Sequence, residues 1–196
     1  MRLILASASP RRAELLRAAG YAFDIVASEV DEATRGGESP SLYVRRLAAD
    51  KSAAVAARAA ADAIVLGADT TVVVDGEILA KPLDDADAGA MLGKLSGRRL
   101  EVITGISLRR GAFELGRVET TAVFFAPLTD EEIAWYVATG EGRDKAGAYA
   151  IQGFASRFIP RIEGSYSNVV GLPVAAVREL LTEISGTRPD RSSPRR

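Results

Sequence analysis

A carboxylate, a hydroxyl and an ammonium group are brought together by one short stretch of the sequence, residues 64–82. Its apolar start predicts a buried strand that leads to Asp69 and Thr70, and the dipeptide Asp75-Gly76 is typical of a two-residue hairpin turn. A turn of that length returns Lys81 to a place beside Asp69. It also fixes the register, so that the expected facing pairs are Thr70–Lys81, Val72–Leu79 and Val74–Glu77.

An Asp–Lys pair at the end of a hairpin is most often a surface ion pair. Two features favour a functional site here. The small residues Gly67 and Ala68 clear space around Asp69, and further charged residues elsewhere in the chain fit the same place. Asp69 and Lys81 are therefore candidate site residues.

The N-terminal segment offers a second group of charges. Residues 3–6 predict a buried strand that runs into Ser7, and the Ser-Pro pair that follows predicts a helix start. Arg11 and Arg12 then occupy the first turn, where each cation opposes the helix dipole at a cost of roughly 0.3–1 kcal/mol. Free backbone N–H groups and guanidinium groups both suit phosphate, so this arrangement favours an anion site over two solvated arginines.

Lys51 and an acidic loop complete the set of candidates. A helix predicted from Ser39 to about Ala60 places Lys51 inside its apolar stripe, where a lysine either snorkels to the surface or points into a cleft. The loop holds Glu29, Asp31 and Glu32, three carboxylates that repel one another unless a metal ion or water lies among them. Both alternatives stay open from the residues alone.

The composition limits the chemistry that these residues can perform. The chain has 196 residues, 47% of them hydrophobic and 26% charged, which fits one soluble globular domain with at most two lobes. It contains no cysteine and no histidine, so a metal must be held by oxygen atoms and a general base must be Asp, Glu, Lys or Tyr. The net charge of −1 gives no basic field for nucleic acid. We find neither a signal peptide nor a membrane span and expect a cytoplasmic protein.

The other elements follow from caps, turns and β-branched runs. A Thr129–Glu132 capping box predicts one of the helices. We expect helices at 84–95, 129–138 and from Pro173, strands at 21–27, 100–108, 113–125, 148–151 and 158–162, and a loop at 164–172.

Eight ordered motifs resemble the Maf family of nucleoside triphosphate pyrophosphatases over residues 3–184. They are ASASPRR, SEVDE, LAADKS, GADT, AKP, LSGR, DKAGAYAIQG and GSYSNVVGLP. The resemblance implies an α/β fold with a long, mixed, curved sheet, flanking helices and two lobes around a cleft, similar to inosine triphosphate pyrophosphatases. We expect a single domain over 1–186 and a disordered tail over 187–196.

The resemblance also implies a reaction, the metal-dependent hydrolysis of a nucleoside triphosphate to the monophosphate and pyrophosphate. Asp69 would accept the proton of the attacking water and also contact the metal, with help from Glu32. The metal would be Mg²⁺ or Mn²⁺. The residues implied to bind the triphosphate are Ser7, Arg12, Lys51 and Lys81.

Three positions resemble the family branch that acts on dTTP and UTP rather than the branch that prefers 7-methyl-GTP. They are Arg11, Thr70 and Gln152. An amide such as that of Gln152 can both donate to and accept from the O4/N3 edge of uracil or thymine. One departure is Ala150, where we expect glycine.

Other functions remain to be weighed against this enzyme. A nucleotide-binding regulator of cell division would bind without cleaving, and an α/β domain could use the arginine-bearing helix to bind a phosphorylated partner. The presence of Asp69, Lys81 and the acidic loop together favours the enzyme. We expect a nucleoside triphosphate as the partner, with neither nucleic acid nor membrane, and a homodimer is left open.

Overall fold

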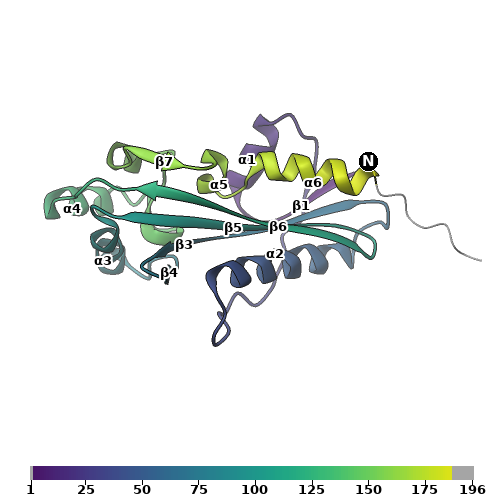
Figure 1. Ribbon diagram of the computed structural model, residues 1–196, viewed down its shortest axis with the longest axis horizontal. Helices are drawn as coiled ribbons and strands as arrows, with labels where there is room; N and C mark the ends of the chain where they lie inside the picture. The colour runs from purple at the N-terminus through teal and green to yellow at the C-terminus, as the bar shows by residue number, and fades with distance from the viewer. Residues whose placement is uncertain (1, 187–196) are drawn as a thin grey trace, which may run out of the picture.

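The computed structural model describes residues 2–186, and the predicted tail at 187–196 lies outside them. Over the described residues the strands form one seven-stranded mixed sheet, in the order β2-β1-β3-β5-β6-β7 with β4 also paired to β3 (Figure 1). The strands are β1 Leu3–Ala6, β2 Asp24–Ile25, β3 Ile64–Val74, β4 Glu77–Leu79, β5 Arg99–Arg110, β6 Phe113–Phe124 and β7 Arg161–Glu163. The predicted α/β fold with a long mixed sheet is confirmed.

Helices cover both faces of this sheet (Figure 1). They are α1 Pro10–Ala18, α2 Pro40–Ala56, α3 Asp85–Leu95, α4 Asp130–Ala138, α5 Tyr166–Val170 and α6 Val174–Gly186, with two 3-10 helices, η1 Ala146–Ala148 and η2 Phe154–Phe158. None of the helices over residues 2–186 is long and apolar enough to cross a lipid bilayer.

Strand β3 is the element on which the site depends. On one edge it pairs with β5 along almost its whole length. On the other edge it pairs with β1 as far as Gly67 and with β4 from Val72 onward, in the register predicted for the hairpin. Residues 68–71 therefore have no strand beside them on that edge, and the gap opens between the ends of β1 and β4.

The alternation of side chains along β3 assigns its residues to two faces. Leu66 and Ala68 pack in the core under α1 and α6, whereas Val65 packs on the opposite face with residues of α2. Gly67 lies on the α2 side, where an added Cβ would be only 2.2 Å from the carbonyl oxygen of Ala48. The glycine therefore lets α2 lie directly against the sheet.

A second core lies at the other end of the long strands, where α3 and α4 pack. It includes Leu92, Val123, Tyr136 and Phe158. The predicted helix starts are confirmed there, since Asp84 caps α3 and Thr129 forms a capping box at α4.

Four local expectations were wrong. Residues 148–151 do not form a strand, because Gly147 and Ala148 adopt φ of 70° and 56° and turn the chain instead. The expected loop at 164–172 contains α5, because the Ser165 side chain accepts a hydrogen bond from the backbone N–H of Asn168 and caps a short helix. The strands expected at 21–27 and 158–162 shrink to β2 and β7.

Candidate active site

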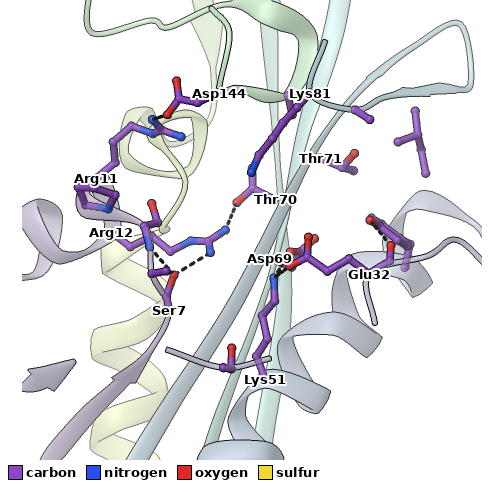
Figure 2. A pocket seen from close by; sticks show the side chains of 18 of the residues that line it. Ser7, Arg11, Arg12, Glu32, Lys51, Asp69, Thr70, Thr71, Lys81 and Asp144 are labelled. Carbon is purple, nitrogen blue, oxygen red and sulfur yellow. Dashed lines mark hydrogen bonds and ion pairs between the residues drawn. The ribbon is translucent and has the colours of Figure 1, made fainter. Parts of the chain in front are cut away.

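A cavity of about 670 Å³ lies over the gap in β3. Chain segments that are far apart in the sequence contribute to its wall, and Figure 2 shows their side chains facing one another across it. The predicted residues in the wall are Ser7, Arg11, Arg12, Glu32, Lys51, Asp69, Thr70 and Lys81. These residues, which were predicted from the sequence to belong to one site, do line one cavity.

Asp69 is the buried carboxylate of this cavity, with 8% of its surface exposed. Lys51 on α2 is its ion-pair partner, with Nζ 2.6 Å from Asp69 Oδ1 and also 2.6 Å from Glu32 Oε1. Of the two alternatives for Lys51, the structure selects the lysine that points into a cleft. Close packing of α2 on Gly67 allows this contact. Asp69 lies two residues after Gly67 on the same face of β3, and the close approach of α2 brings Lys51 within reach of it.

The two carboxylates differ in their electrostatic environment. Burial raises the pKa of Asp69 above its ordinary value, although the charges of Lys51 and Arg12 oppose that shift. Partial burial also disfavours ionisation of Glu32, but its hydrogen bond to Lys51 and the charges of Lys51, Lys81 and Arg12 hold the pKa of that carboxyl below its ordinary value. Asp69 is thus the stronger base of the two.

Arg12 is held on the opposite side of β3 from Lys51. Its guanidinium donates to the carbonyl oxygen of Gly171 at 2.8 Å, to Ser7 Oγ at 3.2 Å and to Thr70 Oγ1 at 3.1 Å. The Thr70 hydroxyl in turn lies 2.9 Å from Thr104 Oγ1. Burial lowers the pKa of Arg12, but a guanidinium stays charged at any working pH. A fixed cation therefore points at the gap.

Arg11 is held differently from its neighbour. Its Nη1 lies 3.0 Å from Asp144 Oδ2, and the two side chains lie next to each other in the wall of the cavity (Figure 2). Asp144 also accepts from Lys145 Nζ at 2.6 Å. The hydrogen bonds from Lys145 and Arg11 lower the pKa of Asp144 to about 2, so this carboxylate is charged at any working pH.

Lys81 was predicted to lie beside Asp69 as its partner. The ladder between β3 and β4 ends at the Val72–Leu79 pair, so the expected pairing of Thr70 with Lys81 is not part of it. Lys81 still lines the cavity, but it forms no ion pair with any of the residues that the structure describes, and Lys51 takes that place. The lysine is exposed and lies in the segment that follows β4.

Gln152 does not line the main cavity. It lines a smaller adjoining cavity of about 60 Å³, together with Tyr149 and Ala150. Arg11 and Thr70 line both cavities, so they lie at the boundary between them. Ala150, the departure from the expected glycine, is not among the described residues with positive φ and tolerates its side chain.

The two carboxylates of the cavity can hold a divalent cation such as Mg²⁺ only if other oxygen atoms complete its coordination shell. Asp69 and Glu32 both reach the Lys51 ammonium, so their carboxylates are close enough to share a cation. Residues 2–186 contain no cluster of three or more Asp, Glu, His or Cys side chains that could hold a metal alone. Mg²⁺ usually takes one or two carboxylates and completes its shell with water and phosphate oxygens. Asp69 and Glu32 would meet that requirement if water and phosphate oxygens completed the shell.

Several residues that build this site were not predicted from the sequence. Asp144, Tyr43 and Thr71 line the cavity, and the Tyr43 hydroxyl donates to the carbonyl oxygen of Glu32 at 3.0 Å. The Gly171 carbonyl binds Arg12. Asp144 and Gly171 lie inside two of the motifs that carried the resemblance, DKAGAYAIQG and GSYSNVVGLP. Those motifs could therefore have indicated that both residues belong to the site.

A solved structure with the same fold is the Ham1 protein of Staphylococcus aureus. It aligns with a TM-score of 0.53 and 16% sequence identity, over 94% of this chain and 100% of that chain. The likeness supports the fold that was expected from inosine triphosphate pyrophosphatases.

Sequence comparison is more specific. This chain is 56% identical over 181 residues to the dTTP/UTP pyrophosphatase of Symbiobacterium thermophilum, covering 92% of this chain and 93% of the relative. It is 50% identical over 180 residues to the dTTP/UTP pyrophosphatase of Vibrio cholerae, covering 92% of this chain and 96% of the relative. Residues 2–184 match the model of the Maf-like protein family. The chain therefore belongs to the Maf family.

Proposed function

We propose that this protein is a nucleoside triphosphate pyrophosphatase that acts on dTTP and UTP and releases the monophosphate and pyrophosphate. The observation that carries this proposal is a buried carboxylate of raised pKa, Asp69, in one cavity with Arg11, Arg12, Lys51 and Lys81. Relatives at 50–56% identity that bear the name dTTP/UTP pyrophosphatase support the same reaction.

The triphosphate binds to the cations around the gap in β3. Arg12 presents a planar guanidinium whose orientation is set by Gly171, Ser7 and Thr70, so its donors are already aimed when the substrate arrives. Lys81 lines the cavity and forms no ion pair with another described residue, so its ammonium turns onto the phosphates. These cations stabilise the negative charge that builds up during attack on phosphorus.

Asp69 accepts the proton of the attacking water. A general base is most effective when its pKa approaches the working pH, and burial moves the pKa of Asp69 in that direction. Lys51 holds the carboxylate in place through the 2.6 Å contact. Cleavage falls between the α and β phosphates.

A divalent cation, Mg²⁺ or Mn²⁺, supplies further charge neutralisation of the phosphates when it is bound. Asp69 and Glu32 are the residues that would hold it, with phosphate and water oxygens completing its shell.

Base selection belongs to the smaller cavity. The amide of Gln152 pairs with the O4/N3 edge of uracil or thymine, and Arg11 and Thr70 border the passage between base and phosphates. A purine is larger and presents a different donor and acceptor pattern.

The test is a panel of nucleoside triphosphates, including 7-methyl-GTP, assayed for pyrophosphate with Mg²⁺, with Mn²⁺ and with EDTA. We expect pyrophosphate and monophosphate from UTP and dTTP, lower rates with ATP and GTP, and loss of activity in EDTA. Tight binding of UTP without turnover would identify a binding protein instead. Release of orthophosphate and a diphosphate would show that the scissile bond is different.

A further inference from the structure

Glu141 binds the chain segment that follows Gln152. It lies just after α4, and its carboxylate accepts from the backbone N–H of Phe154 at 2.9 Å through Oε1. Its Oε2 accepts from the Tyr136 hydroxyl at 2.8 Å and from the backbone N–H of Ala155 at 3.3 Å. One side chain thus satisfies the first two N–H groups of η2.

Tyr136 binds the segment that precedes Gln152. Its side chain is almost fully buried, with 1% of the residue exposed. The same hydroxyl that donates to Glu141 accepts from the backbone N–H of Ala150 at 3.1 Å. Burial and the hydrogen bond to Glu141 raise the pKa of Tyr136 far above the working range, so the hydroxyl keeps its proton. The Tyr136–Glu141 pair therefore holds the chain on both sides of Gln152.

The turn between these two anchors is built around the carboxylate. The N–H of Gly153 donates to the carbonyl oxygen of Ala150 at 3.1 Å and closes the turn. A Cβ on Gly153 would lie 1.7 Å from Glu141 Oε1, so only glycine leaves room for the carboxylate. The position after Gln152 is thus fitted to Glu141.

Neither Tyr136 nor Glu141 lines the main cavity or the smaller one that holds Gln152. They reach any nucleotide only through the turn at 150–154. An exposed glutamine on a free turn would sample many orientations, and its amide would discriminate poorly between base edges. Fixing the backbone on both sides reduces that freedom.

We propose, on the basis of the function proposed above, that Tyr136 and Glu141 are positioning residues that set base selectivity by fixing the turn that carries Gln152. They do not take part in phosphate binding or proton transfer. Their loss changes the choice between bases more than it changes the chemical step.

Three variants of the full chain separate the contacts. Tyr136→Phe removes the hydroxyl and keeps the ring that packs on Phe158 at a centroid distance of 6.1 Å. Glu141→Ala removes every side-chain contact to the turn, whereas Glu141→Gln keeps the shape and part of the hydrogen bonding. The matched control is Ile133→Ala, which weakens the packing of α4 in the same core and touches no polar group of the turn.

The first readout is the ratio of kcat/KM for UTP to that for CTP, two pyrimidines of equal size that differ at the edge facing an amide. We expect the wild type to favour UTP. We expect the ratio to fall about three- to tenfold in Tyr136→Phe and in Glu141→Ala, the range for one poorly made hydrogen bond, and less in Glu141→Gln. Ile133→Ala lowers thermal stability and leaves the ratio unchanged.

The second readout is amide hydrogen exchange at Ala150, Phe154 and Ala155, which needs no activity. Exchange should accelerate at these amides in Tyr136→Phe and Glu141→Ala. If it accelerates while the UTP/CTP ratio stays constant, and Gln152→Ala does change the ratio, the positioning role is wrong and base selection by Gln152 stands. If Gln152→Ala also leaves the ratio unchanged, base selection by Gln152 is wrong and the positioning role fails with it. A fall of the ratio in Ile133→Ala as large as in Tyr136→Phe would likewise overturn the proposal.

Discussion

Asp69 and Lys51 are carried by a strand of 11 residues and a helix of 17, whereas Gln152 is carried by a turn between two 3-10 helices of 3 and 5 residues. The ion pair at the centre of the phosphate side is thus built on regular elements in the middle of the sheet, whereas Glu32 and Lys81 lie in loops. The base side is built on irregular chain at its end.

The two sides are also stabilised by different contacts. On the phosphate side the charged groups hold one another, with Lys51 between Asp69 and Glu32. On the base side a buried tyrosine and a half-buried glutamate hold the backbone of the turn, and the side chain of Gln152 is exposed.

We infer that the two sides suit different tasks, phosphate binding and cleavage on one side and base selection on the other. Every nucleoside triphosphate has the same phosphates, so the groups that bind and cleave them gain from rigid support. The base varies, and a turn held by a few hydrogen bonds can change without disturbing the sheet. Variants on the two sides should therefore fail in different ways.

The largest effect is expected from Asp69→Asn, which should lower kcat by about 10²–10⁴-fold because an amide cannot accept the proton of the water. The fold should persist, since Lys51 keeps Glu32 as its partner. The matched control is Asp75→Asn at the exposed hairpin turn, where asparagine tolerates the φ of 50°. Pyrophosphate release and thermal unfolding measure both. Near-normal turnover of Asp69→Asn would remove this residue from the mechanism.

The protonation of the Asp69 carboxyl should also show a measurable pH dependence. Burial raises the pKa of Asp69, so the carboxyl is protonated, and inactive as a base, up to a higher pH than an ordinary aspartic acid. In the metal-free protein the carbon NMR signal of the Asp69 carboxyl should titrate above the ordinary value of about 3.9. Lys51→Met removes a charge that favours the ionised form and should move the titration further upward. A titration at or below the ordinary value would contradict the raised pKa.

The phosphate side was largely predictable from the sequence. A buried strand, an Asp-Gly turn and a lysine inside an apolar helix stripe are local patterns with local causes. The partner of Asp69 was not predictable in the same way, because Lys51 reaches it only through the packing of α2 on Gly67. That contact depends on tertiary structure.

The base side was poorly predictable for a related reason. Residues 148–151 look like a short strand, but positive φ at Gly147 and Ala148 turns the chain. The resemblance supplied Gln152, whereas the supporting roles of Tyr136 and Glu141 have no local pattern. Their contacts with the turn join residues 13 or 14 positions apart in sequence, and such contacts follow from packing rather than from propensity.

Gln152→Ala should have the next largest effect, on selectivity. Once a bound base covers Gln152, a polar edge left unpaired costs about 1–3 kcal/mol, so the wild type should prefer UTP to ATP by roughly 5- to 150-fold. Gln152→Ala should reduce that preference. Arg12→Ala is the contrast, since it should slow all nucleotides alike. An equal loss for every nucleotide in Gln152→Ala would show that the glutamine only stabilises its own turn.

The smallest effect is expected from Asp144→Asn, at the boundary between the two sides. Asp144 holds Arg11, which lines both cavities, through an exposed contact of 3.0 Å. Exposed ion pairs contribute little, so the change should be about two- to fivefold. We expect the ratio of kcat/KM for UTP to that for ATP to fall with kcat for UTP unchanged, because the guanidinium is no longer held at the smaller cavity. The effect should not vary above pH 4, since the pKa of Asp144 is about 2. If KM instead falls equally for all nucleotides while the ratio stays constant, Arg11 belongs to the phosphate side, and the boundary between the two sides lies beyond it.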